Sequence, residues 1–158
     1  MSVLIKTDGQ KKAVWSTFDL RIEGDLCDLG AMQIRSESLA AHLAGCKRVI
    51  LFAATLGVAF DRELQKSTCL SPARAYELQM QGLREIEQWC DTLCKELAKD
   101  QGGALKKRFS PGYGDLSLEV QREIFRVLDP VKHIGLCLSD SCVMTPSKSV
   151  TAFVGVEE

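Results

Sequence analysis

The residues best suited to bind a ligand lie in one short stretch, residues 106–115 with the sequence KKRFSPGYGD, which we call the Arg-Tyr corner. Pro111 presets φ for the second position of a turn, and Gly112 supplies the positive φ that the third position can require. Arg108 can bind a carboxylate through two parallel hydrogen bonds, and Tyr113 offers an aromatic face and a hydroxyl. This chemistry suits a small ligand with a carboxylate and a flat ring. The same residues are also typical of a plain surface turn, and the corner alone does not separate the two interpretations.

The length, composition and charge of the chain limit the kinds of partner that it is expected to have. The chain has 158 residues, 46% of them hydrophobic and 26% charged, with a formal net charge of −1. This size and composition predict a single domain over residues 1–158. One run of three cations, at residues 106–108, is too short to bind a polyanion, so no nucleic-acid partner is expected. No apolar run has membrane-spanning length and no signal pattern opens the chain, so we expect no membrane contact and a cytoplasmic location.

The cysteines number seven and never form a Cys-x-x-Cys pair. Cys90 and Cys94 are four residues apart and share one face of a predicted helix. A metal site there would need two further ligands, and His42 and His133 are the two histidines of the sequence. Reduced, buried thiols that pack as small hydrophobic groups are the favoured alternative, and no metal ligand is assigned.

The first part, residues 1–70, is predicted to contain N-terminal strands, a short helix and a buried strand. Residues 3–5 and 14–18 have strand composition around a polar turn. Ser36 is a predicted N-cap for a helix over residues 37–44, which Gly45 ends. Residues 49–54 are continuously apolar and predict a central strand buried on both faces. A helix is then expected from Thr55 through Leu64.

The second part, residues 71–158, begins with a long helix. Ser71 followed by Pro72 is a strong helix start, and the helix is predicted to reach about residue 98. Its apolar stripe recurs at helical spacing: Leu83, Ile86, Cys90, Leu93 and Leu97. Gly82 predicts the close approach of another element. Glu87 lies on or beside the stripe, where the favoured interpretation is a glutamate at its edge that reaches solvent.

A further helix is predicted after the corner, with Ser117 as its N-cap and Asp129-Pro130 at its end. The C-terminal residues 134–138 and 150–156 alternate as strands do, and we expect them to pair as an antiparallel hairpin around a long loop. Together these elements predict an α+β fold with an antiparallel or mixed sheet and several helices. The sequence contains neither a Gly-x-Gly-x-x-Gly motif nor a P-loop, and neither histidine has an obvious nucleophile partner.

The stretch Arg108-Phe-Ser-Pro-Gly-Tyr113 resembles the Arg-x-x-x-Gly-Tyr motif of the activation domain of cobalamin-dependent methionine synthase. A second block, from Gly135 through Met144 and Pro146 to Val150, resembles the segment that follows this motif in that domain, with one helix between the two blocks. The resemblance covers about residues 83–155. The N-terminal half is more similar to stand-alone relatives of the domain, in which a strand ends in Ala-Thr-x-Gly.

The resemblance implies the family's S-adenosylmethionine site at five positions. Arg108 takes the place of the family's ligand-binding arginine, and the backbone of Ser110 and Gly112 lines the site. Tyr113 corresponds to the tyrosine that approaches the corrinoid, and Glu87 to a glutamate on the preceding helix. Ser110 stands where the family has alanine, and the family's later tyrosines have no counterpart before Glu158.

The family's chemistry is the reductive methylation of oxidised cobalamin, in which one electron and the methyl group of S-adenosylmethionine regenerate methylcobalamin. The resemblance therefore implies a reactivation subunit for a corrinoid methyltransferase or a truncated methionine synthase, with the cobalamin carried by that partner. A flavodoxin-like or ferredoxin-like protein would donate the electron. Whether the chain counts as an enzyme stays open. Two alternatives also remain open: a docking subunit without S-adenosylmethionine binding, and an unrelated small-ligand protein.

Overall fold

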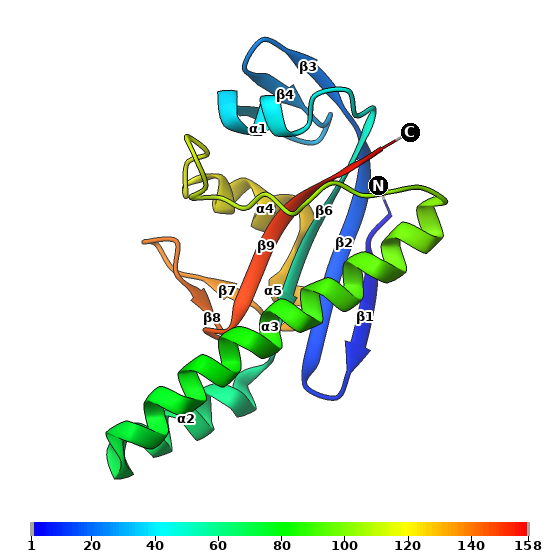
Figure 1. Ribbon diagram of the computed structural model, residues 1–158. Helices are drawn as coiled ribbons and strands as arrows, with labels where there is room; N and C mark the ends of the chain where they lie inside the picture. Colours follow the sequence, from blue (N-terminus) through cyan, green and yellow to red (C-terminus); the bar gives the residue numbers. More distant parts are fainter. Residues whose placement is uncertain (1, 158) are drawn as a thin grey trace.

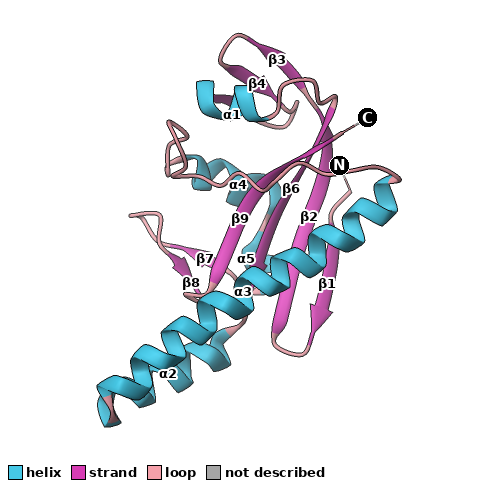
Figure 2. Cartoon of the chain, in the orientation of Figure 1, coloured by secondary structure: helices cyan, strands magenta, loops and turns pink. Residues whose placement is uncertain are grey.

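The computed structural model describes residues 2–157 and is built on a four-stranded antiparallel sheet (Figure 1). Its strands are β1 (Leu4–Asp8), β2 (Lys11–Asp19), β6 (Arg48–Thr55) and β9 (Ser149–Val156), in the spatial order β1-β2-β6-β9. The predicted N-terminal strands and their turn are confirmed, and so is the α+β class. Figure 2 shows the helices lying on both faces of this sheet.

Strand β6 is the centre of the molecule, as its apolar run predicts. It pairs with β2 on one side and with β9 on the other. Because successive side chains of a strand point to opposite faces, Ile50 and Phe52 pack into one core and Val49 and Leu51 into the other. All four side chains are fully buried. The chain thus has two hydrophobic cores separated by one sheet.

One face of the sheet is covered by α3 (Pro72–Gln101), which forms a helical hairpin with α2 (Val58–Leu70). Ser71 caps α3 by accepting a hydrogen bond from the backbone N–H of Arg74, and Pro72 occupies the first turn. The predicted long helix is confirmed, and four members of its stripe are buried: Ile86, Cys90, Leu93 and Leu97. The fifth, Leu83, was wrongly placed in the buried stripe, because its side chain is 49% exposed on the outer side of the helix.

Gly82 allows α2 and α3 to approach closely. A Cβ atom at this position would lie 2.6 Å from Cζ of Phe60 on α2 and 2.9 Å from Cε of Lys148. Ordinary carbon contacts are about 3.5–4.0 Å. The predicted close approach is therefore confirmed, and the ring of Phe60 is the group that occupies the space.

The other face of the sheet is covered by three helices and a small three-stranded sheet. The helices are α1 (Glu37–His42), α4 (Val120–Leu128) and α5 (Pro130–Ile134). The small sheet contains β3 (Arg21–Glu23), β4 (Leu26–Asp28) and β5 (Gln33–Arg35). Ser36 caps α1 through the N–H of Leu39, as predicted. These elements pack on the core side that contains Leu51 and Phe153.

Two predicted helix boundaries are wrong. Thr55 ends strand β6 instead of starting a helix, because α2 begins at Val58 and continues to Leu70. Helix α4 begins at Val120, three residues after Ser117, whose hydroxyl accepts from the N–H of Glu119.

The C-terminal hairpin does not form. Ile134 lies in α5, and β9 pairs with β6 in the central sheet. Instead β7 (Cys137–Leu138) pairs with β8 (Met144–Thr145). The apolar residues of β9 are thus matched to the central strand, where they are buried on both sides.

Within residues 2–157, no helix is long and apolar enough to cross a membrane. The same residues contain no group of three or more histidine, cysteine or acidic side chains arranged to hold a metal ion. The seven cysteines all lie within these residues, and no disulfide joins any two of them.

Candidate functional site

The Arg-Tyr corner is positioned by the free edge of β9. After α3 the chain returns along this edge, and the N–H of Lys106 donates to the carbonyl of Gly155 at 2.9 Å. Phe109 and Phe153 exchange two backbone hydrogen bonds, of 3.0 and 2.8 Å. This pairing covers the edge, and the segment after α3 can be followed across β9 in Figure 1. Arg108 in this segment contacts α3 through Glu87 and Asp91.

The turn that follows uses the backbone groups that the resemblance assigned to ligand binding. The N–H of Gly112 donates to the carbonyl of Leu116 at 2.8 Å, and the N–H of Tyr113 donates to the carbonyl of Ser110 at 3.1 Å. Gly112 has φ of 96°, a conformation that side chains rarely adopt. The side chain of Tyr113 is 55% exposed, and its ring meets the ring of Phe109 edge-on at 5.7 Å.

Asp115 fastens the end of the corner to the N-terminus of α1. Its carboxylate accepts hydrogen bonds from the Ser36 hydroxyl at 2.5 Å and from the N–H groups of Glu37 and Ser38, each at 3.0 Å. These bonds, led by that of Ser36, lower the pKa of Asp115 to about 2. The corner is therefore attached at both ends, to β9 and to α1. No role was predicted for Asp115.

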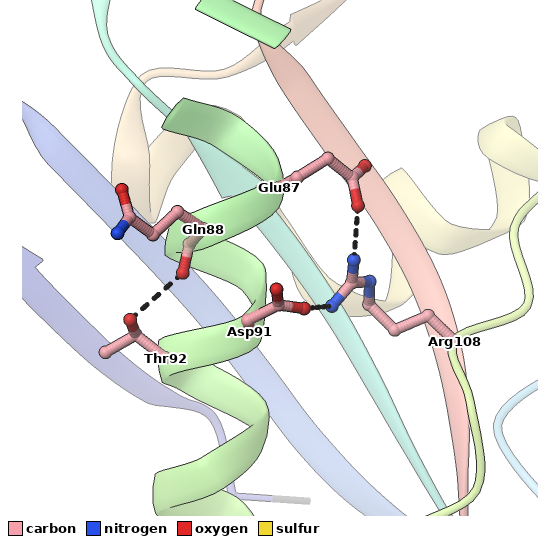
Figure 3. A network of polar contacts seen from close by, with 5 residues as sticks. All are labelled: Glu87, Gln88, Asp91, Thr92 and Arg108. Atoms are coloured by element: carbon pink, nitrogen blue, oxygen red, sulfur yellow. Dashed lines mark hydrogen bonds and ion pairs between the residues drawn. The ribbon is translucent and has the colours of Figure 1, made fainter. Parts of the chain in front are cut away.

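Arg108 lies between two carboxylates of α3 (Figure 3). Its Nη2 donates to Oε2 of Glu87 and its Nη1 to Oδ1 of Asp91, both at 2.6 Å. The side chain of Arg108 is 20% exposed, whereas those of Glu87 and Asp91 are each 61% exposed. Burial lowers the pKa of Arg108, but its hydrogen bonds to Asp91 and Cys94 raise the pKa, and the net direction is upward. Arg108 therefore remains charged.

Two cysteines complete the surroundings of the guanidinium. Burial raises the pKa of Cys90 to about 12, although the charge of Arg108 opposes this shift. Burial also raises the pKa of Cys94, again against the hydrogen bond and charge of Arg108. Both thiols are thus protonated at neutral pH and act as neutral neighbours of the arginine.

A pocket of about 350 Å³ opens beside these groups. Its lining joins α3 to the corner: Asp91, Cys94, Lys106, Lys107, Arg108 and Tyr113. Lys106 turns away from the centre, because its Nζ donates to the carbonyls of His42 and Ala44. The pocket therefore presents an arginine, a carboxylate and an aromatic ring, which together match a zwitterion attached to a flat group.

The structure brings three of the five predicted site residues together. Arg108 and Tyr113 line the pocket, and Glu87 lies outside its lining but is ion-paired to Arg108. The side chain of Glu87 reaches solvent, as the edge interpretation predicted. Ser110 and Gly112 do not line the pocket, since their backbone groups close the turn. Asp91 was missed, although its position four residues after Glu87 places both carboxylates on one helix face.

Similarity to known proteins is found by comparing structures and not by comparing sequences. No protein-family model and no curated protein matches the sequence. A solved structure described as the crystal structure of the MetH reactivation domain bound to AdoHcy superposes with a TM-score of 0.71. The chain has the fold of the MetH reactivation domain. The match covers 92% of this chain and 58% of the other, at 16% sequence identity.

Proposed function

We propose that this protein binds S-adenosylmethionine at the Arg-Tyr corner and presents its methyl group to a corrinoid held by a partner protein. The observation that carries the proposal is the placement of Arg108 between two α3 carboxylates at the edge of the pocket, on the fold of a domain whose solved relative is described as bound to AdoHcy. The pocket's 350 Å³ lies within the range of small-molecule sites, about 300–1,000 Å³.

The polar groups fit the amino-acid end of this ligand. A guanidinium has five N–H donors, and Glu87 and Asp91 each accept one of them. The ligand's carboxylate would bind the remaining donors or replace one carboxylate. The carboxylate so released, with its 61% exposed side chain, is then free to accept a hydrogen bond from the ligand's ammonium.

The proposed methyl transfer needs no side chain of this protein to act as an acid or a base. The partner's corrinoid would supply the nucleophile: one electron from a flavodoxin-like or ferredoxin-like donor would reduce cob(II) to cob(I), which would take the methyl group from the sulfonium and release S-adenosylhomocysteine. Arg108 would fix the ligand, and Tyr113, which is half exposed beside the pocket, would meet the corrinoid face. Positioning of this kind is the main contribution that a protein makes to chemistry carried by a cofactor. The proposed partner is a corrinoid methyltransferase or a truncated methionine synthase.

Calorimetric titration with S-adenosylmethionine and S-adenosylhomocysteine tests the proposal. We expect saturable binding by the wild-type chain. Arg108→Ala should lose about 2–5 kcal/mol of binding free energy, because an ion pair to the ligand is removed, which weakens Kd at least about 30-fold. Arg35→Ala is the matched control, since Arg35 forms an exposed ion pair with Asp25 on the small sheet. Absence of binding by the wild-type chain at millimolar ligand would refute the proposal.

A second candidate function follows from the same ion pairs. Because Arg108 is already hydrogen-bonded to two carboxylates, the corner is stable without a ligand. The chain would then serve as a docking subunit for a corrinoid methyltransferase and would not bind S-adenosylmethionine. Tight association with the corrinoid protein, unchanged by Arg108→Ala and without heat from S-adenosylmethionine, would favour this candidate.

A further inference from the structure

The outer side of α3 carries a row of exposed apolar residues. Tyr76, Met80 and Leu83 are 68%, 38% and 49% exposed. They are spaced by four and three residues, which is the spacing of a coiled-coil seam. Ala73 precedes them and Glu87 follows them at the same spacing. We call these five residues the α3 seam.

The seam lies away from the face by which α3 packs on the protein. Leu78, Gly82 and Ile86 are buried toward α2 and the sheet, and at 100° per residue they lie on another side of the helix from Tyr76 and Met80. The α2–α3 hairpin also extends past the end of the central sheet (Figure 1). A partner can therefore reach this part of the seam without meeting the body of the domain.

We propose that two copies of the chain associate by pairing their α3 helices antiparallel along the α3 seam. The seam has two kinds of position, which alternate along the helix, and in an antiparallel pair each kind faces the other kind on the partner helix. Met80 then faces Leu83 of the partner subunit, and Tyr76 faces Glu87 of the partner subunit. The hydroxyl of Tyr76 donates to that carboxylate. Two hairpins paired in this way form a four-helix arrangement, a common solution for exposed helical hairpins.

The charged residues beside the α3 seam favour this alignment of the two helices, which we call the register. Glu77 and Arg84 flank the seam on one side, and the register brings Glu77 beside Arg84 of the partner subunit, twice by symmetry. Glu77 is 70% exposed and its contact to Arg74 within the chain is long, 3.6 Å. The neighbouring register, in which Met80 faces Tyr76 of the partner subunit, would instead place the two copies of Glu77 side by side. Like charges there oppose association.

The pairing also reaches the candidate site. Glu87 belongs both to the α3 seam and to the ion pairs of Arg108. A hydrogen bond from Tyr76 of the partner subunit would compete with Arg108 for this carboxylate. Asp91, which lies beyond the seam residues, would keep its contact with the guanidinium.

The solution mass of the full chain tests the proposal. Light scattering coupled to size exclusion, over a range of micromolar concentrations, should give twice the chain mass for the wild type. Met80→Glu should give a monomer, because it places two carboxylates at the centre of the seam. Leu118→Glu is the matched control, since Leu118 is also exposed, at 48% against 38% for Met80, but lies in the loop before α4. A monomeric wild type, or a dimer that survives Met80→Glu, would overturn the proposal.

The register is tested separately by exchanging charges. Glu77→Arg and Arg84→Glu should each weaken dimerisation at low salt, because each places like charges side by side. The double variant should restore the wild-type dissociation constant. If the effects add, so that the double variant dimerises more weakly than either single variant, the register is excluded. Circular dichroism of each variant, expected to match the wild type, confirms that the helices are retained.

Discussion

Gly82→Ala should destabilise the protein although alanine is the better helix former. Replacing glycine by alanine in a helix interior gains about 1 kcal/mol. Here the new Cβ would lie 2.6 and 2.7 Å from two ring carbons of Phe60, roughly 1 Å closer than an ordinary contact. Overpacking of this kind costs about 1–3 kcal/mol. The expected net loss in the free energy of unfolding is therefore about 0–2 kcal/mol.

In a chain that also carries Phe60→Ala, we expect Gly82→Ala to raise the free energy of unfolding instead of lowering it. With the ring removed, the remaining close contact is with Cε of Lys148 at 2.9 Å, near the end of a flexible side chain that can shift. Gly82→Ala should then stabilise the chain by about 1 kcal/mol, so that the two changes couple by about 1–3 kcal/mol in a double-mutant cycle. Urea unfolding followed by circular dichroism measures all four proteins. Gln88→Ala, at an exposed position of the same helix, controls for helix propensity. If Gly82→Ala stabilises both backgrounds equally, Phe60 does not occupy the space beside Gly82, and the reasoning fails.

Two further predictions concern titratable groups. The pKa of Asp115 is lowered to about 2 from 3.8, so its contribution to stability is present above pH 4 and is lost as the pH falls through 2. Asp115→Asn should therefore lower the midpoint of urea unfolding at neutral pH. It should also make this midpoint depend less on pH between pH 4 and 2. Cys69 and Cys137 are exposed and should react quickly with a thiol reagent, whereas Cys90, buried with a pKa of about 12, should react only on unfolding. Fast modification of Cys90 in the native chain would contradict its placement.

The elements predicted well are those whose signals are local. Ser71-Pro72 fixes the start of α3, and the apolar run of β6 identifies a central strand. The C-terminal pairing was wrong because alternation shows that residues 150–156 form a strand but not which strand is its neighbour. The central strand β6 takes β9 as its partner, and the segment 134–138 divides between α5 and β7. Leu83 was misplaced for a related reason, since a periodic apolar pattern does not show that a second stripe faces solvent.

The site was predicted in part. The types and order of Arg108 and Tyr113 mark the corner, and the helical position of Glu87 places it near the buried stripe. The attachment of Asp115 to α1 was not predictable, because it joins residues 77–79 positions apart in the sequence. The return of residues 105–109 along β9 is a long-range pairing of the same kind. Contacts of this range depend on the assembled sheet rather than on local sequence.

In the proposed site, the two carboxylates beside Arg108 would favour ligand binding more than they oppose it. Each ion pair joins an arginine side chain that is 20% exposed to an acidic side chain that is 61% exposed. Pairs in such surroundings contribute about 0.2–1 kcal/mol each, so displacing one of them costs at most about 1 kcal/mol. An unrestrained arginine side chain would lose up to about 2 kcal/mol of rotamer freedom on binding. Because Glu87 and Asp91 already fix the guanidinium, most of that loss is absent, and the arginine is oriented before the ligand arrives.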